Sequence, residues 1–201
     1  MPIPTTHLHL CSLLLEEISD IDAYTFCLGS IAPDCLDPSD HRAFRNAHHI
    51  DDSGRFDSLG FYRKQLCRKQ EQDIAPRSYR LGYFSHLWFD EFAKHPDEQI
   101  FIEQPGKKPA NRQLLHSEIM HLDRTAVLNM GASIEAPSRP LELPVINGID
   151  PNKTAEKYRT TVARLRRMQV GTPPAGFVSA SAYADFLVSA KRGFRRCLEA
   201  L

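Results

Sequence analysis

Apolar side chains recur at intervals of three and four residues in several long stretches of the chain, which is the spacing of one face of an α-helix. The alternating pattern of a half-buried strand is scarce. The stretches with helical spacing cover residues 8–19, 57–70, 79–93, 110–131, 153–168 and 179–201, and a shorter apolar segment covers 24–29. The pattern therefore predicts an all-α protein.

Proline, glycine and aspartate mark the breaks between the predicted helices. Residues 30–40 contain Pro33, Pro38 and three aspartates, which together predict an irregular loop. Residues 171–176 begin and end with glycine and predict a turn between the last two helices.

The proline-rich segment at 137–150 predicts an extended connection within one domain that spans residues 1–201. The segment at 1–136 would form the core. We expect the C-terminal helices at 151–201 to pack on that core, because about fifty residues are too few to bury a sizeable core alone.

The strongest chemical signal lies in the segment LGYFSHLWFDEF at 81–92. His86 and Asp90 are separated by four residues, so both project from one face of a helix. Aromatic and aliphatic side chains cover most of the remaining circumference, which indicates a helix buried on nearly all sides. A buried carboxylate costs several kcal/mol unless it is paired or bound to a metal, so Asp90 needs a cation or a structural arginine partner.

Further nitrogen and oxygen donors lie on other predicted elements. His7 precedes the first long helix, Asp34 ends the motif GSIAPD, and His48 and His49 lie in NAHHIDD. Each is a weak signal alone, because a single histidine is usually a core or surface residue and Pro-Asp is a common turn. The whole set is of the kind that binds zinc in proteins.

These motifs, in this order along the chain, resemble those of the zinc-dependent phospholipase C family, particularly its short bacterial members. The resemblance implies an all-α fold and metal-dependent hydrolysis of phosphoester bonds in a small phosphorylated substrate. It places Asp34, His49, His86 and Asp90 at a main metal site. It makes His7 a ligand of a second metal, and Asp90 would bridge the two metals. His49 is chosen over His48 because the family's histidine precedes an apolar residue, here Ile50.

Larger members of the family carry a downstream HxxxE motif, which this chain lacks. The nearest segment, LLHSEIMHLD, holds His116, Glu118 and His121 at a different spacing. We expect these three residues and His48 to support the metal ligands at most, without binding the metal themselves. The donors therefore predict one tightly bound zinc and a second, weaker one. Iron, manganese or nickel would also suit such ligands.

The overall charge of the chain is balanced, with 25 basic and 25 acidic residues, which argues against a nucleic-acid-binding protein. No segment reaches the roughly twenty apolar residues of a membrane span. The first residues lack the positive charge and long apolar run of a secretion signal, so we expect a cytoplasmic protein. The five cysteines form no CxxC pair, which argues against a disulfide framework.

Two other classes of protein also fit part of the pattern. HD-type phosphohydrolases place histidines and aspartates on helices, but they require an adjacent His-Asp dipeptide that this chain lacks. A non-catalytic helical module could hold one structural metal and dock a partner through the basic segment at 159–167. A catalytic site would differ from it by leaving one coordination position open to water.

Overall fold

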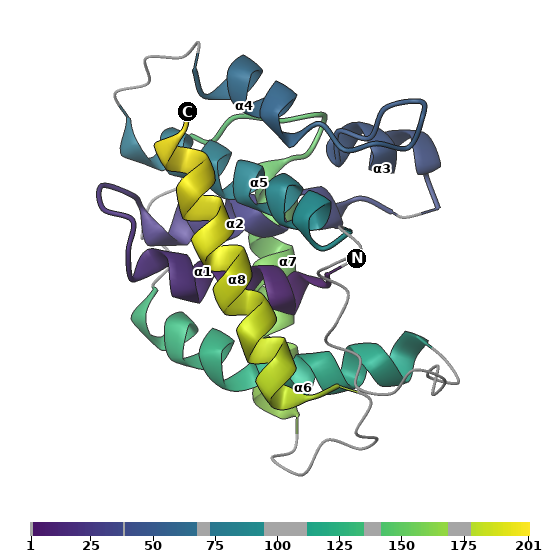
Figure 1. Ribbon diagram of the computed structural model, residues 1–201, viewed down its shortest axis with the longest axis vertical. Helices are drawn as coiled ribbons and strands as arrows, with labels where there is room; N and C mark the ends of the chain where they lie inside the picture. Colours follow the sequence, from purple (N-terminus) through teal and green to yellow (C-terminus); the bar gives the residue numbers. More distant parts are fainter. Residues whose placement is uncertain (1, 38, 68–72, 95–111, 135–141, 169–177) are drawn as a thin grey trace.

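The computed structural model describes residues 2–37, 39–67, 73–94, 112–134, 142–168 and 178–201. The described elements are α1 (Pro4–Leu15), α2 (Ala23–Ile31), η1 (Pro33–Cys35), α3 (His41–Ala47), α4 (Ser58–Gln65), α5 (Ile74–Phe92), α6 (Arg112–Ser133), α7 (Pro151–Arg167) and α8 (Ala180–Glu199) (Figure 1). Over these residues the only β-structure is two isolated bridges, so the predicted all-α class is confirmed. All five cysteines are free thiols.

The segment at 30–40, which the sequence predicts as an irregular loop, is partly helical, and a further helix follows it. The 3-10 helix η1 lies inside the expected loop at 30–40, and α3 follows it as an unexpected helix. The side chain of Asp40 accepts a hydrogen bond from the backbone N–H of Ala43 and so caps α3. The expected turn at 171–176 and residues 137–141 of the expected connection lie outside the described residues.

The centre of the molecule is the pair of helices α2 and α5, which make the most extensive contact in the fold. A Cβ atom at Gly29 would lie 2.0 Å from the carbonyl oxygen of Tyr79, and one at Gly82 would lie 2.0 Å from that of Phe26. Only glycine permits this approach of two backbones, which brings the end of α2 against the middle of α5.

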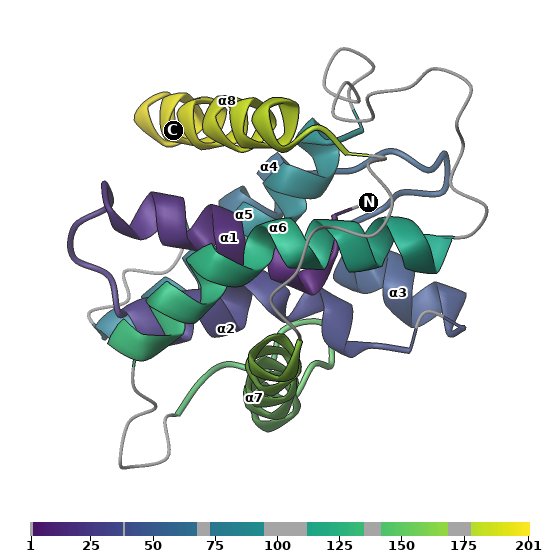
Figure 2. The same ribbon diagram turned by 90° about the horizontal axis from the view of Figure 1, so that it is seen from below.

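The remaining long helices cover this pair from several directions. Helices α1 and α6 pack against each other, and α1 also contacts α2. Helix α8 lies across α1 and α5, whereas α7 packs on α2 and α6 at the opposite side of the molecule (Figure 2). The two C-terminal helices thus pack on the N-terminal part of the chain. None of the described helices combines the length and apolar content needed to cross a lipid bilayer.

Candidate metal centre

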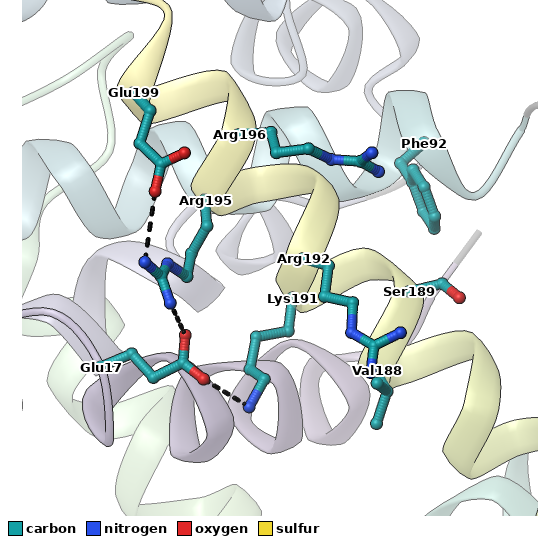
Figure 3. A pocket seen from close by; sticks show the side chains of 9 residues that line it. All are labelled: Glu17, Phe92, Val188, Ser189, Lys191, Arg192, Arg195, Arg196 and Glu199. Carbon is teal, nitrogen blue, oxygen red and sulfur yellow. Dashed lines mark hydrogen bonds and ion pairs between the residues drawn. The ribbon is translucent and has the colours of Figure 1, made fainter.

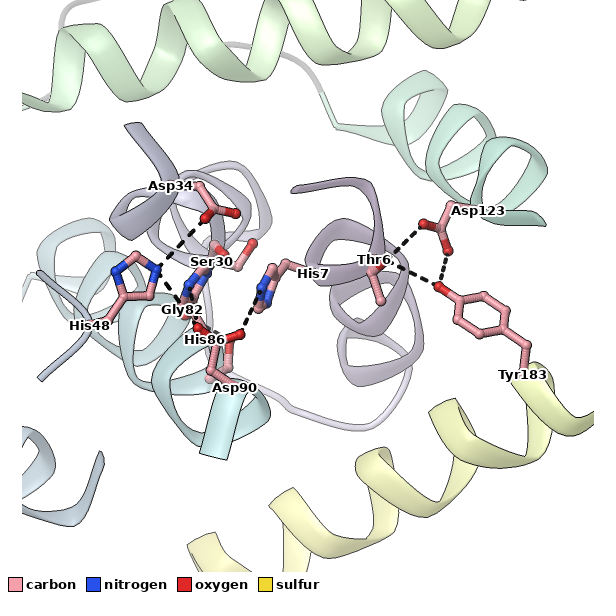
Figure 4. Close-up of polar contacts among 11 residues, drawn as sticks. Thr6, His7, Ser30, Asp34, His48, Gly82, His86, Asp90, Asp123 and Tyr183 are labelled. Atoms are coloured by element: carbon pink, nitrogen blue, oxygen red, sulfur yellow. Dashed lines mark hydrogen bonds and ion pairs between the residues drawn. The ribbon is translucent and has the colours of Figure 1, made fainter. Parts of the chain in front are cut away.

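Five polar side chains that come from four elements meet beside the contact between α2 and α5 (Figure 4). They are His7 from α1, Asp34 from η1, His48 at the end of α3, and His86 and Asp90 from α5. The side chains of the three histidines and Asp90 are at most 1% exposed, and that of Asp34 is 15% exposed. Asp34 is therefore the one member of this cluster with appreciable access to solvent.

Asp90 lies at the middle of the cluster. Its Oδ2 atom is 3.4 Å from Nε2 of His86 and 3.7 Å from Nε2 of His48, and its Oδ1 atom is 3.6 Å from Nε2 of His7. Nε2 of His48 is also 3.7 Å from Oδ1 of Asp34. Donors from three histidines and two carboxylates thus surround one small region at separations longer than ordinary hydrogen bonds.

Backbone carbonyls orient two of the imidazole rings. Nδ1 of His86 lies 2.7 Å from the carbonyl oxygen of Ser30, and Nδ1 of His48 lies 2.9 Å from that of Phe44. A carbonyl only accepts hydrogen bonds, so Nδ1 carries a proton in both rings and Nε2 of each ring faces the carboxylates. The same arrangement fixes the orientation of histidines that bind metals.

Several atoms that face one another in this cluster lack hydrogen-bond partners. They are Nε2 of His7, His48 and His86, Oδ2 of Asp34 and both carboxylate oxygens of Asp90. Buried polar atoms in folded proteins are nearly always paired, and leaving them unpaired costs free energy. Lone pairs that converge without protons between them are the environment that a metal cation satisfies, so this donor set fits a metal ion.

The charges of the cluster are strongly coupled. Burial alone would lower the pKa of His86, but the combined effect of Asp90, Asp34 and the Ser30 carbonyl raises it. Burial would raise the pKa of Asp90, but the combined effect of His86 and His7 holds it far below its usual range. The ring of His7 stacks on that of His86 with 3.7 Å between centroids, and burial together with the His86 charge lowers the pKa of His7. Asp90 is therefore ionised and His7 neutral near pH 7.

The structure places His48, and not His49, in the cluster, which corrects the choice made from the sequence. His49 has φ of 48°, a left-handed backbone conformation, and its side chain points in a different direction from that of His48. Its ring packs edge-on against Phe61 at 5.2 Å between centroids. The apolar residue that follows His49 therefore does not identify the histidine that joins this cluster.

The comparison with known families covers the part of the chain that contains these residues. The model of the family described as zinc-dependent phospholipase C matches residues 6–137, which is more than half of the chain and includes all five members of the cluster. The chain belongs to the zinc-dependent phospholipase C family. No match was found among curated proteins or among solved structures.

Zinc is compatible with the site, because imidazole nitrogens and carboxylate oxygens are ligands that zinc commonly takes. Two overlapping groups have donors close enough together for one ion. The first comprises His7, Asp34 and His86, and the second comprises His48, His86 and Asp90.

The three candidates on α6 lie away from the cluster. The buried carboxylate of Glu118 accepts a hydrogen bond from the backbone N–H of Val178 and so anchors the segment before α8. His116 lines a surface pocket beside the first turn of α1. His121 is half-buried on α6 and belongs to neither group of potential metal ligands. None of the three belongs to either group, so the HxxxE position of larger zinc-dependent phospholipase C proteins has no counterpart among them.

Asp123 forms a second buried polar network that the sequence did not reveal. It accepts hydrogen bonds from the hydroxyls of Thr5 at 2.8 Å, Thr6 at 3.1 Å and Tyr183 at 2.6 Å, and Nδ1 of His9 lies 2.9 Å away. These bonds join α1, α6 and α8 next to His7 (Figure 4). Thr5, Thr6 and His9 are close together in the sequence, but they lie more than a hundred residues from Asp123, so no local pattern indicates the network.

Proposed function

We propose that this member of the zinc-dependent phospholipase C family hydrolyses phosphoester bonds with zinc held by His7, Asp34, His48, His86 and Asp90. The observation that supports the proposal most directly is the convergence of three buried Nε2 atoms on the carboxylates of Asp34 and Asp90. No hydrogen bond joins these atoms. A merely structural ion-pair cluster would have protons between its members and shorter separations.

The five residues would supply the ligands of the bound metal. His48, His86 and Asp90 would hold one ion, and His7 and Asp34 would add donors through the overlapping group that they form with His86. When bound, zinc would lower the pKa of a coordinated water and polarise the phosphoryl oxygens of the substrate. Ser30 and Phe44 would keep His86 and His48 in the tautomer that binds metal.

The substrate would approach from the side of Asp34. This carboxylate is the most exposed of the five, whereas Asp90 and its three histidines are closed off by the core. Excluding water from the other sides would strengthen the electrostatic effect of the ions on a phosphoryl group.

A non-catalytic metal-binding module is the second candidate, because most of the donors are as buried as those of a structural site. Metal analysis of the purified protein, combined with a panel of phosphomonoesters and phosphodiesters, separates the two. Hydrolysis that chelation abolishes and zinc or manganese restores supports the proposal. A zinc-loaded protein that is inert on the whole panel, and that unfolds when chelated, supports the structural module instead.

A further inference from the structure

A pocket of about 610 Å³ lies between the first turn of α1, the start of α6 and the outer face of α7. Its volume is within the usual range for small-ligand sites. The lining residues are Ile3, Pro4, Thr5, Gln113, His116, Met120, Lys157, Thr161 and Arg164. Polar side chains that can donate hydrogen bonds therefore converge from three helices on one hollow.

The lining of this pocket is basic. Lys157, Thr161 and Arg164 lie on one face of α7, because they are separated by four and three residues along the helix. His116 adds an imidazole side chain from α6. Among the described residues that line the pocket there is no aspartate or glutamate, and no described carboxylate forms an ion pair with Lys157 or Arg164. The positive end of the α1 dipole lies at the same wall and adds to the potential.

Two of the helices that line the pocket also approach the metal centre. Its wall includes Thr5, two residues before His7 in the same turn of α1. Helix α7 also contacts η1, which carries Asp34, and the charge of Lys157 acts on Cys35, the residue after Asp34. A ligand in this pocket would therefore lie on the side of the cluster where α7 contacts η1.

A second basic pocket does not share these properties. It lies between α8 and the end of α1, and its volume is about 670 Å³ (Figure 3). Glu17 pairs with Lys191 at 2.8 Å and with Arg195 at 2.9 Å, so acidic partners already neutralise part of its charge.

We propose that the pocket formed by α1, α6 and α7 binds a second phosphate group of the substrate, next to the phosphoester that is cleaved. Lys157 and Arg164 would make charge-assisted hydrogen bonds to it, and Gln113 and Thr161 would add neutral donors. The substrate class would then be phosphoesters that carry an additional phosphate. This substrate assignment rests on the proposed hydrolase function, whereas the anion-binding property of the pocket does not.

The anion-binding property can be tested without the metal. Full-length protein is stripped with a chelator and titrated with inorganic phosphate at constant ionic strength, with the phosphorus NMR signal as readout. The double variant Lys157→Gln, Arg164→Gln should bind phosphate at least about tenfold more weakly, because two charged donors are lost. Arg167→Gln is the matched control, since Arg167 lies on α7 outside the pocket. Equal affinity in the double variant and in wild type overturns the site.

The substrate assignment is tested with zinc-loaded protein and two esters of the same alcohol, one with and one without a second phosphate. The ratio of their kcat/KM values should fall about tenfold in the double variant and stay constant in Arg167→Gln. An unchanged ratio with retained phosphate binding shows that the pocket takes free phosphate and overturns the substrate assignment. Failure to hydrolyse either ester refutes the hydrolase function and its substrate assignment, while the phosphate titration still decides the pocket.

Discussion

Nδ1 of His86 lies 2.7 Å from the carbonyl oxygen of Ser30, one turn of α5 beyond Gly82, where α5 approaches α2 closely. This contact directs Nε2 of His86 toward Asp90, 3.4 Å away. The packing of α5 on α2 therefore determines which ring nitrogen of His86 faces the candidate metal centre.

Asp90→Asn should lower the affinity for zinc at least about a hundredfold, because the amide cannot supply the negative charge that compensates a bound cation. Glu91→Gln is the neighbouring control. The carboxylate of Glu91 accepts a hydrogen bond from the hydroxyl of Ser58 at 2.6 Å, so its loss should cost about 1 kcal/mol of stability without changing zinc affinity. Equal zinc loss in both variants, measured by competition with a fluorescent chelator, would contradict this assignment.

His48→Asn should remove a metal ligand and lower zinc occupancy sharply, whereas His49→Asn should leave it unchanged. Asparagine is chosen because it tolerates the left-handed backbone of residue 49. Both variants are purified from zinc-supplemented cultures, and their metal content is measured by mass spectrometry. If His49→Asn proved to be the zinc-free protein, the position of α3 in the structure would be wrong.

His7→Ala should retain one tightly bound zinc and lose a second, weaker one. His7 approaches the other donors through Oδ1 of Asp90 at 3.6 Å, whereas His48 and His86 share Oδ2. Calorimetric titration of the metal-free protein should show two unequal sites in wild type and one in the variant, with reduced activity. His9→Gln serves as the control, because His9 contacts Asp123 rather than the cluster. Two equally tight sites in wild type would refute the proposal.

Gly82→Ala should destabilise the protein by on the order of 2–4 kcal/mol and weaken zinc binding. The added Cβ would lie 2.0 Å from the carbonyl oxygen of Phe26 and 3.0 Å from the amide nitrogen of Ser30, so α2 and α5 must separate. Gly131→Ala is the matched control in another helix, because its nearest neighbours lie at 3.8 and 3.9 Å. That variant should be neutral or more stable by up to about 1 kcal/mol in urea unfolding.

Removing the metal should reverse the pH dependence of stability around neutrality. In the metal-free protein the charge of Asp90 raises the pKa of His86 against the opposing effect of burial. The interaction of His86 with Asp90 contributes its full stability to the folded protein below the pKa of an ordinary histidine. This contribution is lost as the pH rises through the raised pKa of His86. In the zinc-loaded protein the ligands must be deprotonated, so stability should instead fall as the pH decreases. Thermal unfolding with and without chelator across pH 6–8.5 measures both slopes, and parallel slopes would contradict the prediction.

Local sequence was sufficient for the parts of the site that depend on one element. The helical period alone put His86 and Asp90 on one face of a single helix, and the surrounding aromatic residues indicated that this face is buried. The order of the motifs then identified the zinc-dependent phospholipase C family, which the match over residues 6–137 confirms.

Tertiary structure decided which other residues meet that helix. His48 and His49 are adjacent and chemically equivalent in the sequence, and a left-handed backbone at residue 49 alone separates the cluster member from the residue that packs on Phe61. The network of Asp123 and the basic pocket beside α1 join residues more than a hundred positions apart. Periodicity describes one helix at a time, whereas the relative placement of helices depends on side-chain packing across the whole core, such as the contact that Gly29 and Gly82 permit.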